Sequence, residues 1–227
     1  MSANLNLNKY KNLLSNTKLF CDMDDNKIKN ALNLLSAEIL SYNKDEYLHA
    51  PYTPMKKFGL ILSGTVHVCM DDIEGNKIIM AQVTPGITFG ESICFLNIED
   101  SPVYVYAFEY TDVLWLSADR FFKDFKEEFS INLKKRFITM LAQRTLLLNN
   151  RIQILSKLTI REKITTYLSI MARQTNSTKI QITMSREDFA TYIGSNRCAL
   201  SRELSNMKRE GLIDYGKNYI QIIKQKD

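Results

Sequence analysis

The stretch 194-GSNRCALSRELSNMKREGLI-213 decides how the whole chain is interpreted. If residues 196–210 form a helix, Leu200, Leu204 and Met207 follow the i, i+4, i+7 spacing of one buried stripe. Gly194-Ser195 is typical of a tight turn with a helix cap, and Gly211 is typical of a helix end. Another face of this helix is small, polar and basic, and it carries Arg197, Cys198, Ser201, Arg202 and Ser205. Such a helix suits either a plain protein surface or an element that reads another molecule.

The segments on both sides of this stretch favour the second interpretation. In 185-SREDFATYIG-194, Ser185 followed by Asp188 resembles a capping box and predicts a first helix that ends at Gly194. After the stretch, LIDYG and YIQII predict two strands around a Gly-Lys-Asn turn, which is a hairpin suited to a wing. Upstream, the spacing predicts a helix over 160–174 and a short strand within KIQITM. Together these elements predict a winged helix-turn-helix with the quoted stretch as its recognition helix.

The charge distribution points to a polyanionic partner. Residues 156–227 carry 13 Lys and Arg against 7 Asp and Glu, whereas residues 1–155 carry 17 against 18. The net charge of +5 therefore comes from the C-terminal third. A basic segment of this kind is typical of nucleic-acid binding, although a solvated basic face has the same composition.

The N-terminal half contains two segments with different patterns, a helical one and a strand-rich one. Residues 5–35 are predicted to be helical, with Asp24 or Asp25 as a cap and Ile28, Leu32 and Leu35 on a buried face. From about 37 to 116, prolines and glycines separate short runs rich in β-forming residues, which are FGLILSG, TVHVCM, KIIMAQV, VYVYAFE and VLWLS. Short strands between regular turns predict an all-β sandwich or barrel.

A long helix is predicted over 118–156. Apolar side chains repeat along it with the 3, 4 spacing of a coiled-coil seam, which Thr145 interrupts. The seam consists of Ile138, Leu141, Thr145, Leu148, Ile152 and Leu155. A second apolar stripe consists of Leu133, Phe137, Met140, Leu147 and Ile154. Two apolar faces indicate two partners, the β domain and a second copy of the chain; the alternative is one broad face buried within a monomer.

The chain resembles the Crp/Fnr family of bacterial transcription regulators over nearly its whole length. The resemblance rests on FGLILSGTVHV, PGITFGES, the seam helix and, above all, SREDFATYIGSNRCALSRELSNMKREGLI. It implies an α+β fold: an N-terminal cyclic-nucleotide-binding-type β-roll, or jelly roll, in residues 1–117, a dimerisation helix in 118–156 and a winged helix-turn-helix in 157–227. It also implies a homodimer that binds a pseudo-palindromic site on double-stranded DNA through helix 196–210, and RNA polymerase as a partner if the protein activates transcription.

The resemblance places the DNA contacts at the helix-turn-helix. Arg197 and Arg202 occupy positions that contact bases or phosphates, and arginine bonds guanine well. Cys198 stands where the family usually has Glu, so we expect a target different from that of the cyclic-AMP receptor protein. Ser185 and Arg186 are placed for phosphate contacts. The full expected set is Ser185, Arg186, Ser195, Asn196, Arg197, Cys198, Ser201 and Arg202.

The effector side departs from the cyclic-AMP binders. Gly90-Glu91 is retained, but the Arg-Ser pair that takes the phosphate falls on Ser101-Pro102. The Thr-Ser pair of the long helix falls on Leu148-Asn149. Without the arginine, no nearby group replaces its bidentate bond to the phosphate, so we expect a small ligand other than cyclic AMP, or no ligand. The expected pocket is lined by Gly90, Glu91, Ser92, Ser101, Tyr104, Leu148 and Asn149.

We expect no cofactor and no metal. An iron–sulfur cluster needs an N-terminal cysteine cluster, and only Cys21 lies there. Haem needs an axial ligand, and His49 and His67 are more typical of structural histidines. The four cysteines (Cys21, Cys69, Cys94 and Cys198) are scattered and are expected to be free, with Cys69 and Cys94 packed in strands and Cys198 open to redox control.

Two other classes of function stay open at this point. One is a ligand-binding β-roll protein whose helical domain binds a protein partner. The other is a cupin-like enzyme, but the two histidines do not form the His-x-His pattern of metal barrels, and we expect no catalysis. The N-terminus lacks the blocks of a signal peptide and no run reaches about 18 apolar residues, so a cytoplasmic protein without a membrane partner is expected.

Overall fold

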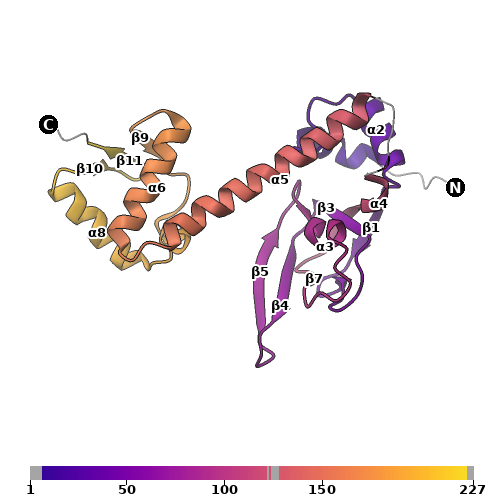
Figure 1. Cartoon of the computed structure of the whole chain (residues 1–227), viewed down its shortest axis with the longest axis horizontal. Coiled ribbons are helices and arrows are strands. Elements are labelled where there is room, and N and C mark those ends of the chain that lie inside the picture. The colour runs from indigo at the N-terminus through magenta and orange to yellow at the C-terminus, as the bar shows by residue number, and fades with distance from the viewer. Residues whose placement is uncertain (1–6, 122, 124–127, 224–227) are drawn as a thin grey trace. The chain divides into compact units, whose positions relative to one another are not determined.

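The computed structural model describes residues 7–121, 123 and 128–223, which belong to two compact units. The first unit covers Met1–Met140 and the second covers Leu141–Asp227. Each unit has its own hydrophobic core. Figure 1 shows the order of the helices and strands along the chain.

The N-terminal helices are shorter than the sequence predicts, because non-helical chain separates them. They are η1 (Leu7–Tyr10), α1 (Lys11–Asn16) and α2 (Asp25–Leu34). Thr17 ends α1 with an extended backbone, and Asp22 then adopts a left-handed backbone with φ of 58°, so the helix expected over 5–35 is interrupted between them. The side chain of Asp24 caps α2 by accepting a hydrogen bond from the Lys27 N–H at 2.9 Å, as predicted. Residues 5 and 6 of the predicted helix lie outside the described residues.

Two antiparallel four-stranded sheets make up the β-roll. The five strand-forming runs predicted from the sequence are all strands. The sheet orders are β1-β8-β3-β6 and β2-β7-β4-β5. The strands are β1 (Glu38–Tyr42), β2 (Tyr47–His49), β3 (Lys57–Ser63), β4 (Val66–Asp71), β5 (Lys77–Val83), β6 (Thr88–Phe89), β7 (Tyr104–Ala107) and β8 (Thr111–Ser117).

The two sheets pack face to face around buried side chains. This core consists of Ile61, Val66, Val83, Phe89, Val105, Val113 and Trp115, which come from both sheets. Two short helices, α3 (Glu91–Phe95) and α4 (Ala118–Phe121), follow β6 and β8. The aromatic rings of Phe58, Phe95 and Phe121 surround that of Phe137, with centroids 4.6 to 5.4 Å from it. This aromatic cluster fixes the start of the long helix on the roll.

A buried carboxylate ties the N-terminus to the roll. Asp112 of β8 accepts hydrogen bonds from Ser41 at 2.5 Å, Ser63 at 3.0 Å and Lys9 at 3.1 Å, and also one from the Tyr10 hydroxyl. Burial alone would raise the pKa of Asp112, but these hydrogen bonds hold it well below its usual range. The carboxylate is therefore ionised in the folded protein at neutral pH.

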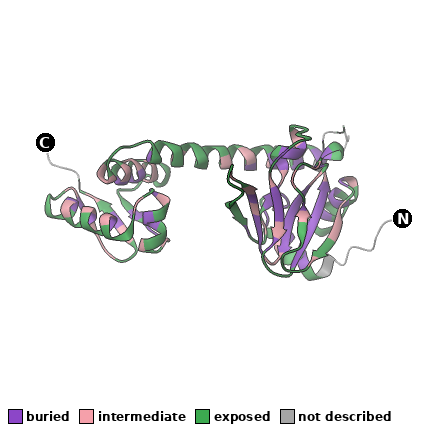
Figure 2. Cartoon of the chain, turned by 90° about the horizontal axis from the view of Figure 1, so that it is seen from below, coloured by how far each residue is buried: buried purple, intermediate pink, exposed green. Residues whose placement is uncertain are grey.

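The long helix α5 (Glu128–Leu155) begins later than the predicted start at residue 118, because residues 118–121 form the separate helix α4 and the chain bends at residue 123. Residues 122 and 124–127 of the predicted helix lie outside the described residues. Of the predicted second stripe, Leu133, Phe137 and Met140 are buried in the first unit and Ile154 is buried in the second, whereas Leu147 is 57% exposed in the single chain. Leu147 falls in the middle of the helix, where neither core reaches it. Figure 2 shows this middle part as exposed.

Beyond the end of α5, the described part of the second unit consists of three helices and a small sheet. Thr159 and Glu162 form a capping box at the start of α6. The sheet order is β10-β11-β9, so the predicted wing hairpin has a third strand along its edge. The elements are α6 (Ile160–Thr175), β9 (Lys179–Gln181), α7 (Arg186–Tyr192), α8 (Arg197–Arg209), β10 (Ile213–Tyr215) and β11 (Tyr219–Ile222). Leu200, Leu204 and Met207 of α8 lie in the core, as predicted.

Candidate functional site

The turn between α7 and α8 depends on one glycine and two capping side chains. Gly194 has φ of +65°, and a Cβ placed there would lie 2.9 Å from Cδ2 of Leu155. Ser185 caps α7, as predicted, by accepting from the Asp188 N–H at 3.1 Å. Asn196, and not Ser195, caps α8, because its side chain accepts from the Ala199 N–H at 2.8 Å.

One face of α8 is free to contact a partner. The side chains of Arg197, Cys198, Ser201, Arg202 and Ser205 are all exposed. Within the part of the chain that the structure describes, neither Arg197 nor Arg202 forms an ion pair. The charges of both guanidinium groups are thus available for an anionic partner.

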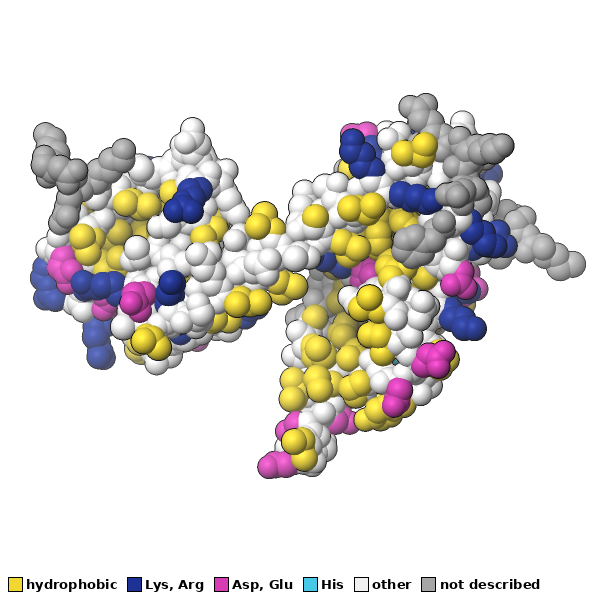
Figure 3. Space-filling model, in the orientation of Figure 1, with side chains coloured by type: hydrophobic (Ala, Val, Ile, Leu, Met, Phe, Trp, Pro, Cys, Tyr) yellow, Lys and Arg dark blue, Asp and Glu magenta, His cyan; other side chains and the backbone are white. Residues whose placement is uncertain are grey.

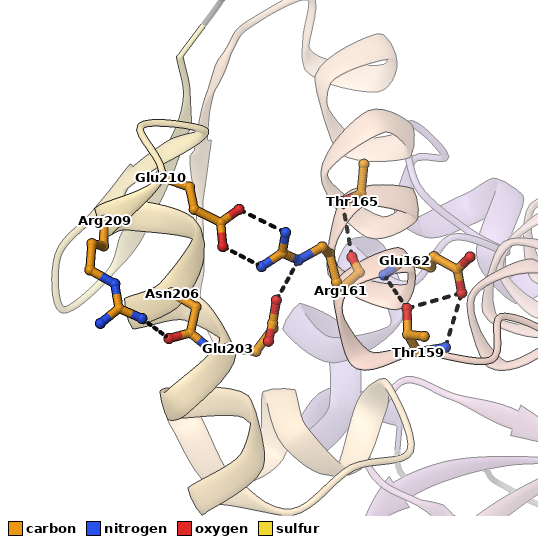
Figure 4. Close-up of polar contacts among 8 residues, drawn as sticks. All are labelled: Thr159, Arg161, Glu162, Thr165, Glu203, Asn206, Arg209 and Glu210. Carbon is orange, nitrogen blue, oxygen red and sulfur yellow. Dashed lines mark hydrogen bonds and ion pairs between the residues drawn. The ribbon is translucent and has the colours of Figure 1, made fainter.

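The acidic side chains of α8 are turned away from that face. Arg161 of α6 binds Glu203 through Nε at 2.6 Å, and its Nη1 and Nη2 atoms each lie 2.7 Å from an oxygen of Glu210, just after α8 (Figure 4). Arg161 thus makes a bidentate bond to one carboxylate and a single bond to the other. This cluster, which we call the Arg161 clamp, fixes the orientation of α8 and offsets one of the two negative charges of Glu203 and Glu210.

The wing is held against both helices through Tyr215. The Tyr215 hydroxyl lies 3.1 Å from the Ser205 Oγ atom, and the charged groups of Arg186 and Lys208 each lie 5.4 Å from the centre of its ring. Arg186 also donates to the Gly216 carbonyl at 2.6 Å, and Lys208 pairs with Asp214 at 2.6 Å. The Nη1 atom of Arg186 is buried and has no hydrogen-bond partner among the described residues. The side chain of Arg186 therefore supports the wing.

The sequence did not single out the Arg161 clamp or Tyr215. Glu203 and Glu210 are seven residues apart, so their position on one face of α8 was predictable. Their common partner in another helix was not, because it depends on how α6 packs against α8. Nor does the sequence show that Arg186 would reach the carbonyl of Gly216 in the wing.

Three of the seven residues expected at the effector pocket lie together in the first turn of α3. Gly90 is the N-cap of α3 with φ of 82°, and Ser92 is exposed. Glu91 is 6% exposed and accepts a hydrogen bond from the Thr88 hydroxyl. The Thr88 Oγ1 atom also lies 3.9 Å from the Met140 sulfur of α5. Glu91 thus has a local structural role within the roll.

The polar groups of the next two expected pocket residues are engaged by other partners. Ser101 is buried, and its hydroxyl accepts from the Val103 N–H at 3.2 Å. The Tyr104 hydroxyl donates to Asp71 at 2.7 Å, and burial raises the pKa of Tyr104. Leu148 and Asn149 are exposed residues of α5 in the second unit.

Two of the four free cysteines are buried. Cys69 packs in β4 as expected, but Cys94 lies in α3 and not in a strand, because the chain turns into a helix after Gly90. Burial raises the pKa of both thiols, that of Cys94 to about 12. Cys198 is exposed on α8, as expected for its place on the outer face.

The two histidines differ in their surroundings. His67 lies 2.9 Å from the Tyr106 hydroxyl through Nδ1 and stacks on Phe108 with ring centroids 4.7 Å apart. His49 is buried, and its Nε2 atom has no hydrogen-bond partner among the described residues. In the same part of the chain, no group of three or more His, Cys, Asp or Glu side chains is arranged to hold a metal ion. None of the described helices combines the length and apolar character needed to cross a membrane.

Family models match both parts of the chain. A cyclic nucleotide-binding domain matches residues 39–128 and a Crp-like helix-turn-helix domain matches residues 162–226. The two models together span more than half of the chain and match in the order that the sequence predicts. The chain belongs to the Crp/Fnr family.

Solved structures share the fold of this Crp/Fnr protein. DNR from Pseudomonas aeruginosa is 20% identical, with 95% of this chain and 94% of that chain covered and a TM-score of 0.50. A protein from Ruegeria pomeroyi, whose structure is titled as that of a cyclic nucleotide binding protein assigned by similarity, is 18% identical. The match covers 96% of this chain and 95% of that chain, with a TM-score of 0.51. At these identities the likeness shows the fold alone. None of the curated proteins compared with this chain matches it.

The predicted fold class is confirmed. A cyclic-nucleotide-binding-type β-roll, a long helix and a helix-turn-helix follow one another along the chain. This is the fold of a DNA-binding transcription regulator of the Crp/Fnr type.

Proposed function

We propose that this Crp/Fnr protein is a homodimer that binds a pseudo-palindromic DNA site through α8 and so regulates transcription. The observation that carries the proposal is the division of charge on that helix. Arg197 and Arg202 face outward without ion pairs in the described part of the chain, whereas Glu203 and Glu210 are bound by Arg161. The exposed face of α8 therefore has the positive charge that DNA attracts.

Sequence is read by the first turns of α8. In a helix-turn-helix, the N-terminal residues of the recognition helix contact base edges in the major groove. Arg197 and Arg202 offer bidentate donors for guanine, and Ser201 offers a hydroxyl between them. Cys198 provides a small, weakly polar surface, so the opposing base is contacted through shape or an apolar group. Ser195 and Asn196 complete the set beside them.

Phosphates are bound around this reading face. The N-terminus of α7, with Ser185 as its cap, presents backbone N–H groups to the DNA. Lys217 is exposed in the wing turn and adds a charge there. Arg186 contributes indirectly, because its guanidinium bonds the carbonyl of Gly216 and so holds the turn in place.

The dimer forms through the seam of α5. Ile138, Leu148 and Ile152 are 62 to 65% exposed and Leu155 is 41% exposed, so the chain alone leaves the seam uncovered. Figure 3 shows hydrophobic side chains along this helix and also on the hairpin of β4 and β5. A coiled-coil pairing of two seams buries these side chains. Two copies of α8 about 34 Å apart then enter successive major grooves.

The effector, where there is one, is a small molecule other than cyclic AMP. The position that carries the phosphate-binding arginine in cyclic-AMP binders is Ser101, whose hydroxyl accepts a hydrogen bond from the backbone N–H of Val103. We propose no iron–sulfur cluster, haem or other cofactor. If the protein activates transcription, RNA polymerase is its further partner.

Selection of genomic fragments by the purified full chain tests this function. We expect a palindromic motif with a footprint of two helical turns. Arg202→Ala should lower the preference for that motif by about tenfold or more, since one bidentate base contact is worth about 1–3 kcal/mol. Arg209→Ala removes the same charge two turns further along α8 and serves as the control, because it should weaken all sequences alike. Equal losses on the motif and on random DNA for both variants would disprove the reading role of Arg202.

A further inference from the structure

A groove of about 430 Å³ lies at the edge of the β-roll formed by β1 and β2. These are the end strands of the two sheets, whereas β6, which leads into Gly90, ends the first sheet on the opposite side. The volume of the groove is within the range of small-molecule sites. The groove is lined by Glu38, Leu40, Tyr42, Leu48, His49, Pro54, Met55, Lys56, Lys57 and Trp115.

Most of the lining is aromatic or apolar. The indole of Trp115 donates to the Tyr42 hydroxyl at 3.0 Å, which fixes two aromatic side chains beside each other. Leu40 is 43% exposed on the same side of β1 as Tyr42, and Leu48 of β2 packs against the core of the roll. Two fixed aromatic side chains beside exposed apolar surface favour a ligand with a flat apolar body.

The polar groups of the lining favour an acid. Lys57 pairs with Glu38 at 2.5 Å. The neighbouring Lys56 also lines the groove, and its ammonium group forms no ion pair in the described part of the chain. His49 is buried, its Nε2 atom is unpartnered there, and burial lowers its pKa, so the ring is neutral near pH 7. The groove therefore offers one unpaired cation at its rim and one imidazole for a hydrogen bond.

We propose that this groove binds a small aromatic monocarboxylate, and that such an acid is an effector of the protein. The ring of the acid lies against Leu40 and Tyr42, whose hydroxyl is bonded by the indole of Trp115; its carboxylate pairs with Lys56, and His49 bonds a polar atom of the ligand. The site differs from the pocket expected around Glu91. Its role as an effector site rests on the proposed DNA-binding function, whereas the binding itself does not.

Contacts within the first unit connect the groove to α5. Met55 lines the groove and lies against Gly90, since a Cβ on Gly90 would be 2.5 Å from the Met55 sulfur. Gly90 starts α3, whose Glu91 bonds Thr88, and Thr88 contacts Met140 of α5. A ligand that displaces Met55 therefore alters the packing beneath the long helix.

The intrinsic fluorescence of the full chain tests the binding, because Trp115 is its only tryptophan. The probes are benzoate, phenylacetate and 4-hydroxyphenylacetate, with phenylacetamide as the uncharged control. We expect a saturable change with at least one acid and a weaker one with the amide. Lys56→Gln should weaken the acid about tenfold, as expected for one charge-assisted hydrogen bond, and Lys44→Gln is the matched control outside the groove.

A second variant keeps the test independent of the rim lysine. Leu40→Glu places a carboxylate in the groove at an exposed position and should abolish the change. No change with any of the three acids, or a change that persists in Leu40→Glu, would overturn the proposal. DNA selection with and without the acid separates the two proposals: a palindromic motif recovered regardless of the acid leaves the DNA-binding function standing and removes the effector role.

Discussion

A charge placed on the seam of α5 should separate the proposed dimer. Ile152 is 63% exposed in the single chain. Full burial of such a side chain is worth about 1.5–3 kcal/mol, so burying the exposed part stabilises the dimer by about 1–2 kcal/mol in each protomer. Because the residue occurs twice in a symmetric dimer, Ile152→Glu should weaken dimerisation by about 2–4 kcal/mol, or about 30- to 1,000-fold, before repulsion between the two carboxylates is added.

Sedimentation equilibrium of the full chain measures this change directly. The matched control is Asn150→Glu, which adds the same charge on the other side of α5. Ile152→Glu should also lose affinity for a complete palindrome but keep the affinity of one copy for a half-site, since α8 is unchanged. If Ile152→Glu and Asn150→Glu had the same monomer–dimer equilibrium as the unaltered chain, the seam would not be the dimer interface.

Three further changes test other parts of the structure. Asp112→Asn should lower the free energy of unfolding at neutral pH and make it depend less on acid. The depressed pKa of Asp112 contributes stability that is complete above about pH 4 and is lost as the pH falls further. Denaturant unfolding at several pH values measures this change, and an unaltered acid slope would refute it. Leu204→Ala should destabilise the second unit by about 2–5 kcal/mol, since Leu204 is 1% exposed, and calorimetry should show the transition of the first unit unchanged. Arg186→Ala should weaken binding to all DNA while keeping its salt dependence, whereas Lys217→Ala should lower the salt slope by about one; equal slopes in both variants would contradict the wing-supporting role of Arg186.

The sequence predicts the elements of this protein better than its contacts. The stripe of Leu200, Leu204 and Met207 has a period that only a helix satisfies, and the cap at Asp24 is local, so both were correct. The sequence does not reveal the break in the N-terminal helix or the helix at Cys94, because the extended backbone at Thr17 and the left-handed backbones at Asp22 and Gly90 are stabilised by the surrounding fold.

In the candidate site, too, the elements were predictable from the sequence and the contacts between them were not. The outward face of α8 was predictable from spacing alone. In the Arg161 clamp, Arg161 is separated by 42 positions in the sequence from Glu203 and by 49 from Glu210. Arg186 and Gly216 are 30 positions apart. Neither contact can be predicted without knowing how the helices pack. Periodicity places Leu147 in the second apolar stripe but does not show where the helix leaves one core and enters the next, so its exposure is visible only in the structure.

The close approach of Gly194 to Leu155 limits how such a protein can evolve. Leu155 belongs to the seam and also lies against the turn that precedes α8, where a Cβ would be 2.9 Å away. A substitution at Leu155 that strengthens the pairing of two chains also changes the support of the turn. In the proposed dimer, subunit affinity and DNA preference therefore both depend on this residue and should not change independently. Compensating changes should accumulate at residue 155 and around the turn together, while position 194 stays restricted to glycine by both its backbone angle and its lack of space.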